Sequence, residues 1–229
     1  MHAVRLFCFP HAGGGAAAYR PWVGKLGPEI EVVPVHLPGR EARIAEPAHQ
    51  SMDALAERTL DELAPSMDRP YAFFGHSMGA SLAWEIARRS SPLGLIASAR
   101  RAPHLPTQRK RLSDLPDAEF AAALGEFGGT SREVLENPEL VELLLPTLRA
   151  DFGVSEQFLA PPELKVQCPV VAMAGEDDPQ VARDEIAAWS ESTTDTFHSH
   201  HFEGGHFYLA DGNPEVLSVV RQEILRFAS

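Results

Sequence analysis

The sequence has few cysteines, no long hydrophobic run and a deficit of basic residues. Only two of its 229 residues are cysteine. Cys8 lies inside an apolar stretch and Cys168 just before another, so we expect two buried thiols rather than a disulfide. No apolar run reaches the roughly 18–20 residues that a membrane-spanning helix needs. Twenty basic against 32 acidic residues give a net charge of −12, which argues against nucleic acid as a partner because phosphates attract basic surfaces.

Linkers, low-complexity tracts and internal repeats are also missing. The chain, 44% apolar by composition, is therefore expected to form one domain over residues 1–229 with a substantial core. A predicted strand begins at Val4, which leaves no room for a signal peptide. We accordingly expect a cytoplasmic protein, and a monomer as the default.

Short apolar, β-branched stretches alternate with amphipathic ones along most of the chain. This alternation predicts an α/β fold, with a mostly parallel sheet of six to seven strands and helices on both faces. In such a sheet, ligands bind beyond the carboxyl ends of the strands. The predicted strands are 4–9, 31–35, 71–74, 93–98, 170–174 and 196–202, and the predicted helices are 16–26, 52–63, 78–89, 117–127, 138–158, 183–189 and 214–227.

The pentapeptide Gly-His-Ser-Met-Gly at residues 75–79 lies between a predicted strand and a predicted helix. A serine at the apex of so tight a turn needs neighbours almost without side chains two positions before and after it, and both are glycine. The turn exposes the hydroxyl at the positive N-terminus of the following helix. This nucleophile-elbow pattern predicts a serine hydrolase with Ser77 as nucleophile, whereas His76 is expected to be a packing residue.

A serine hydroxyl becomes a good nucleophile when an imidazole takes its proton and a carboxylate orients that imidazole. His206 follows two glycines after the last predicted strand, and an acidic turn at 176–178 follows another strand. The order serine, acid, histidine is that of the α/β-hydrolase fold. We prefer Asp178 as the acid because Pro179 fixes the backbone next to it. The alternatives in the same turn are Asp177 and, less favoured, Glu176.

An oxyanion hole needs two backbone N–H donors. One is expected from Met78, the residue after the nucleophile, and the other from the glycine-rich loop at residues 9–15. That loop lacks the Gly-x-Gly-x-x-Gly spacing and the Gly-Lys-Ser/Thr ending of nucleotide-binding loops, so we expect no nucleotide there. A histidine cluster could suggest a metal site, but strand alternation sends its last two members to opposite faces. No metal or cofactor is therefore expected; the cluster is His198, His200 and His201.

About 70 residues separate the predicted strands ending at 98 and beginning at 170, although a parallel crossover needs only about a dozen. The interval contains predicted helices with apolar residues at helical spacing. We interpret residues 103–160 as a helical lid over the active-site end of the sheet. The alternative is an ordinary helical insertion packed on the flank.

Several motifs taken together resemble one known family, the type II thioesterases. These are stand-alone α/β-hydrolases that accompany polyketide synthases and nonribosomal peptide synthetases. The resemblance extends over nearly the whole chain, including parts of the insertion at 115–117 and 143–151. The motifs that carry it are residues 9–14, 37–41, 75–79, 101–103 and 204–207.

The resemblance implies an editing enzyme that hydrolyses aberrant or stalled acyl groups from the phosphopantetheine thiol of an acyl or peptidyl carrier protein. It implies Ser77, Asp178 and His206 as the catalytic triad and the amides of Ala12 and Met78 as oxyanion donors, with no cofactor besides the carrier's own arm. The rival hypotheses are a generalist carboxylesterase or lipase on the same fold and, more remotely, a non-catalytic binding module.

An acidic carrier requires a local basic surface on this acidic protein. Five basic residues fall within twelve positions near the predicted lid. We hypothesise that this segment recognises the carrier, the alternative being a solvated loop. The five residues are Arg100, Arg101, Arg109, Lys110 and Arg111.

Overall fold

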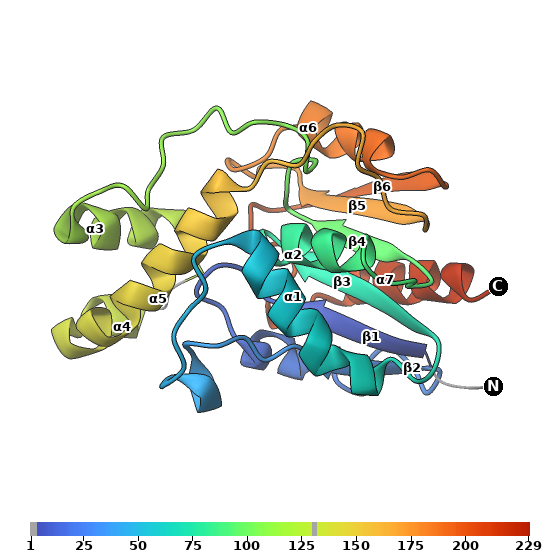
Figure 1. Cartoon of the computed structure of the whole chain (residues 1–229), viewed down its shortest axis with the longest axis horizontal. Helices are drawn as coiled ribbons and strands as arrows, with labels where there is room; N and C mark the ends of the chain where they lie inside the picture. The colour runs from blue at the N-terminus through green and yellow to red at the C-terminus, as the bar shows by residue number, and fades with distance from the viewer. Residues whose placement is uncertain (1–3, 130–131) are drawn as a thin grey trace.

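The computed structural model describes residues 4–129 and 132–229, which form a three-layer α/β structure (Figure 1). Its centre is a six-stranded sheet in which every neighbouring pair of strands is parallel. The predicted strands are thereby confirmed, with ends that differ by up to two residues. In spatial order the strands are β2 (Ile30–Pro34), β1 (Val4–Phe9), β3 (Tyr71–His76), β4 (Leu95–Ser98), β5 (Val170–Gly175) and β6 (Phe197–Phe202).

Helices cover both faces of the sheet because successive strand residues point to opposite sides. Phe7 and Phe9 of β1 pack in one core, against α1 (Met52–Leu63), α2 (Met78–Ala87) and α6 (Arg183–Ala187). Leu6 and Cys8 pack in the other, against α7 (Pro214–Phe227). Figure 1 shows α1 and α2 in front of the sheet and α7 behind it.

The helix predicted over 16–26 is the clearest error in the predicted secondary structure. The segment forms a 3-10 helix, η1 (Ala16–Trp22). Pro21 has no N–H to donate to the carbonyl four residues earlier, so the α-helical pattern cannot run through it. Gly24 then adopts a φ of 75° and turns the chain away.

The interval between β4 and β5 contains α3 (Asp117–Phe127), α4 (Arg132–Leu135) and α5 (Pro138–Gln157). These helices lie beyond the end of the sheet that is opposite the C-terminus (Figure 1). A small core joins Phe120 and Leu124 of α3 to Leu148 and Phe152 of α5. The short α4 was missed by the sequence prediction. Within the described residues no helix combines the length and apolar character needed to cross a bilayer.

Candidate active site

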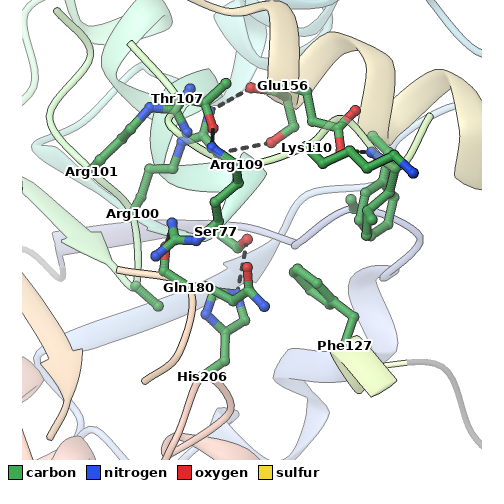
Figure 2. A pocket seen from close by; sticks show the side chains of 15 residues that line it. Ser77, Arg100, Arg101, Thr107, Arg109, Lys110, Phe127, Glu156, Gln180 and His206 are labelled. Carbon is green, nitrogen blue, oxygen red and sulfur yellow. Dashed lines mark hydrogen bonds between the residues drawn. The ribbon is translucent and has the colours of Figure 1, made fainter. Parts of the chain in front are cut away.

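Loops from three different strands bring the predicted triad together at the carboxyl edge of the sheet. The hydroxyl oxygen of Ser77, after β3, lies 3.1 Å from Nε2 of His206, after β6. Nδ1 of His206 lies 2.9 and 3.1 Å from the carboxylate oxygens of Asp178, after β5. All three side chains are buried, and Figure 2 shows the Ser77–His206 contact. The geometry is that of a nucleophile, a base and an orienting acid.

The structure distinguishes among the three candidate acids. The Asp178 carboxylate also accepts the N–H of Gln180 at 2.7 Å, which fixes its direction toward His206. Asp177 and Glu176 are exposed, and Glu176 pairs with Arg183 at 3.1 Å. Only Asp178 of the three contacts the imidazole among the described residues.

The turn at Ser77 is as tight as its glycines imply. Ser77 has φ 55° and ψ −118°, a backbone conformation that residues with a Cβ rarely adopt. A Cβ on Gly75 would lie 2.1 Å from the Gly79 carbonyl oxygen, and one on Gly79 would lie 2.2 Å from the Phe9 carbonyl oxygen. Because these neighbours are backbone atoms, they cannot move aside cheaply. The serine is therefore held in one strained position.

The two predicted oxyanion donors lie in different turns: Met78 follows Ser77 in the elbow, and Ala12 lies in the turn after β1. Ala12 and Gly13 are the central residues of a β-turn closed by the Gly14 N–H donating to the His11 carbonyl at 2.9 Å. The positive φ of Gly13, 75°, matches a type II turn. Within the part of the chain that is described, the amides of Ala12 and Met78 have no hydrogen-bond acceptor. Both are thus available to a developing oxyanion.

Two further histidines surround the base, and sequence reasoning did not assign them this place. The ring centroids of His11 and His76 lie 5.9 Å apart, and the ring centroid of His76 lies 5.1 Å from that of His206. Burial, followed by repulsion from His206, lowers the pKa of His11 to about 4 and that of His76 well below its ordinary value. His76 Nδ1 also contacts the Ser98 hydroxyl at 2.9 Å. The site therefore holds two neutral imidazoles that add no positive charge beside His206.

A cavity of about 250 Å³ opens directly onto Ser77 and His206 (Figure 2). Its lining includes polar side chains, Arg109, Lys110, Glu156 and Gln180 among them. It also includes the aromatic rings of Phe127 and Phe152, which come from the insertion. The ring of Phe127 lies 5.2 Å from that of His206 between centroids. The cavity thus combines polar and aromatic side chains beside the serine.

Three of the five basic residues proposed to bind a carrier already donate hydrogen bonds to other groups of the protein. Arg100 donates to the Ser81 hydroxyl of α2 at 2.9 Å and to the Ser155 carbonyl of α5 at 2.5 Å. Burial, and then the charge of Arg101, lower the pKa of Arg100 to about 9, so it stays charged at neutral pH. Arg101 is buried and donates to the Leu105 carbonyl.

Arg109 is exposed, but its guanidinium donates to the carbonyls of Pro179 and Gln180, next to Asp178. Lys110 and Arg111 are exposed and form no ion pair among the described residues. Arg100 and Arg101 are thus not available to a partner, which leaves Arg109, Lys110 and Arg111 as the exposed residues of the hypothesised carrier segment. The sequence could not show this, because basic residues after a strand usually face solvent.

The histidines of β6 separate as strand alternation predicts. His200 contacts Glu223 of α7 at 2.8 Å, whereas His201 lies beside Glu176 and Arg183 on the α6 side. His198 is exposed. The described residues contain no cluster of three potential metal ligands.

The parallel sheet, the strained serine and the hydrogen-bonded chain to His206 and Asp178 define a serine hydrolase of the α/β-hydrolase fold. Comparison with known proteins narrows the class. The thioesterase-domain family matches residues 4–224, and the chain belongs to this family.

Three similar proteins illustrate the relationship. Thioesterase PikA5 of Streptomyces venezuelae is 40% identical over 230 residues, which are 97% of this chain and 82% of that protein. Linear gramicidin dehydrogenase LgrE of Brevibacillus parabrevis is 38% identical over 96% of this chain and 88% of that protein. The structure of the type II thioesterase BorB from the borrelidin biosynthetic cluster is 39% identical, with a TM-score of 0.88, over 97% of this chain and 93% of that one. The solved relatives also include YbtT, a type II thioesterase from the yersiniabactin nonribosomal peptide and polyketide pathway, in agreement with the resemblance seen in the sequence.

Proposed function

We propose that this thioesterase removes aberrant or stalled acyl groups from the phosphopantetheine thiol of a carrier protein, with Ser77, His206 and Asp178 as its catalytic triad. The observation that carries the proposal is the hydrogen-bonded chain from Asp178 through His206 to Ser77, which opens into a cavity lined by both polar and aromatic side chains. We do not propose a dehydrogenase activity for this chain, although one relative is named a dehydrogenase. The glycine-rich loop at residues 11–15 lacks the glycine spacing of dinucleotide-binding loops.

The chemistry follows from this geometry. His206 Nε2 takes the Ser77 proton as the hydroxyl oxygen attacks the thioester carbonyl, and Asp178 stabilises the imidazolium that forms. The amides of Ala12 and Met78 donate to the oxyanion. The imidazolium then protonates the departing sulfur, a good leaving group because a thiol has a pKa of about 8.5. Water activated by the same imidazole attacks the acyl-serine, and the carboxylic acid and the free Ser77 hydroxyl are released.

The insertion at residues 103–160 supplies Phe127 and Phe152 to the lining of the cavity, which supports its role as a lid over the active site. An acyl group lying against Phe127 and Phe152 would place its carbonyl beside Ser77, with the pantetheine arm along Arg109 and Gln180. A cytoplasmic monomer remains part of the proposal, and the buried free thiols Cys8 and Cys168 fit a reducing compartment.

A matched pair of substrates separates this function from that of a generalist esterase. One acyl group is presented as an N-acetylcysteamine thioester and as the corresponding oxygen ester, and each rate is divided by the rate without enzyme. We expect kcat/KM, normalised in this way, to favour the thioester by at least about tenfold. Equal normalised values, or a preference for the oxygen ester, would support the esterase instead.

The carrier interface is assigned to the two cations that remain uncommitted, Lys110 and Arg111. Their charge would attract an acidic carrier toward the cavity mouth. The double change to glutamate should raise KM for an acyl-carrier substrate about tenfold and leave KM for the small thioester unchanged. Lys165→Glu is the matched control, because Lys165 is exposed just before β5, at the other end of the sheet. An equal rise for both substrates, or an equal effect of the control, would refute this interface.

A further inference from the structure

The Leu-Pro-Gly-Arg-Glu motif at residues 37–41 takes no part in the chemistry described so far, yet its arginine is buried. The Arg40 guanidinium forms a two-pronged ion pair with Asp151 of α5. Nη1 lies 2.5 Å from one carboxylate oxygen and Nη2 lies 2.9 Å from the other. Both side chains are about 95% buried. A buried pair of this kind needs further hydrogen bonds to satisfy its remaining atoms.

Those further bonds are made to the turn that carries Ala12. The Asp151 carboxylate accepts the N–H of Gly13 at 2.8 Å, and Arg40 Nη1 donates to the Gly14 carbonyl at 3.2 Å. Glu41, the next residue of the motif, accepts the N–H groups of Ala16 and Ala17 at 3.0 and 2.9 Å. Arg40 and Glu41 of the loop after β2, together with Asp151 of α5, therefore hold four backbone groups in the segment that follows β1.

The Gly13 N–H belongs to the central peptide of the type II turn. Glycine also tolerates the negative φ of a type I turn, in which this peptide is rotated by about half a turn. Such a rotation would point the Ala12 carbonyl oxygen at the Asp151 carboxylate. The Ala12 N–H belongs to the preceding peptide, which this rotation leaves in place. The buried carboxylate selects the type II turn, and together with the Arg40 bond to the Gly14 carbonyl it fixes the position of the turn that carries the Ala12 amide.

We propose that Arg40 and Asp151 are positioning residues that hold the Ala12 amide in the oxyanion hole. The inference rests on the proposed catalytic function, because it assigns Ala12 as a donor. Asp151 and Thr147, which donates to the Gly39 carbonyl at 2.9 Å, both belong to α5. The C-terminal part of this lid helix is therefore tied to the oxyanion turn, so a displacement of α5 reaches the reaction centre directly.

The test uses Asp151→Asn and Arg40→Lys with a small acyl thioester, so that no carrier contact enters. We expect kcat to fall about 100-fold with KM changed less than about threefold, because the lost interaction acts on the oxyanion. The affinity for an alkyl boronic acid, whose tetrahedral adduct resembles the intermediate, should fall by the same factor. Asp117→Asn, which removes an exposed ion-pair partner of Arg149, is the control and should change neither value. Wild-type kcat in both variants would overturn the proposal.

A double variant separates positioning from simple stability. Arg40→Met combined with Asp151→Leu replaces the buried pair with apolar side chains, so its Tm should recover relative to either single variant. Active sites are counted by titration with a fluorophosphonate. We expect kcat per active site to stay low although Tm recovers, and a kcat that recovers together with Tm would refute positioning. If the proposed catalytic function itself is wrong, Ser77→Ala should remain active. This variant therefore distinguishes a failure of the proposed function from a failure of the positioning role.

Discussion

Replacing Ser77 by glycine and by alanine should give two inactive proteins of different stability. The φ of 55° and ψ of −118° at Ser77 cost about 1–3 kcal/mol for a residue with a Cβ. Glycine removes this strain but loses about 0.5–1 kcal/mol through greater freedom in the unfolded chain. Both variants lose the 3.1 Å contact with His206, which therefore cancels in the comparison. We expect the glycine variant to be more stable than the alanine variant by about 1 kcal/mol.

Urea unfolding measures this difference, with fluorescence from the buried Trp22, Trp84 and Trp189 as the probe. The slope m should be equal in both variants, so that the midpoints report stability alone. Ser218 is the matched control, because it is exposed in the middle of α7. There alanine should be more stable than glycine by about 1 kcal/mol. The strained-elbow reasoning is refuted if alanine is also the more stable residue at position 77.

Two further predictions concern the elbow and the neutral histidines. Gly75→Ala should lower the free energy of unfolding by at least about 3 kcal/mol in urea titrations, because the new Cβ would lie 2.1 Å from a backbone oxygen. Gly153→Ala in α5, where the nearest atom is 3.5 Å away in a side chain, should be neutral or stabilising; equal losses at both sites would contradict the clash. His11 has a pKa lowered to about 4 by burial and by His206, with the Gly129 carbonyl opposing this and Arg40 adding to it. Between pH 6.5 and 4 the His11 imidazole is protonated in the unfolded state but not in the folded state, so the free energy of unfolding of the wild type should fall by about 3 kcal/mol from this residue as the pH falls. His11→Gln should flatten this dependence on pH, and an unchanged dependence would exclude His11 as its source.

The parts of the fold that were predictable depend on local patterns. The strands are short apolar runs bounded by turns, and helices such as α1 and α7 have a serine or asparagine cap that accepts a backbone N–H. The elbow was predictable because its requirement, a glycine two residues before and two residues after the serine, is met within five adjacent positions, residues 75–79. Chain order indicated the acidic turn at 176–178 and His206, since each follows a strand of the same parallel sheet. Within that turn, Pro179 favoured Asp178.

The remaining features depend on contacts between distant residues. Arg40 and Asp151 are 111 residues apart, and neither has a local signal that distinguishes it from a solvated charge. Arg100 follows a strand as an exposed residue would, but α2 and α5 provide acceptors that draw its guanidinium inward. His11 and His76 become neutral because their rings are packed around His206, and only the tertiary structure brings them there.

The central claim is that Ser77 releases acyl groups from the pantetheine arm of a carrier. The most direct test incubates the enzyme with a panel of acyl-loaded carrier proteins and follows loss of the acyl mass by intact-protein mass spectrometry. We predict that wild-type protein returns at least part of the panel to the free-thiol form and that Ser77→Ala leaves it loaded. Carriers that stay loaded with the wild type, or that lose their acyl groups equally with Ser77→Ala, would contradict the claim.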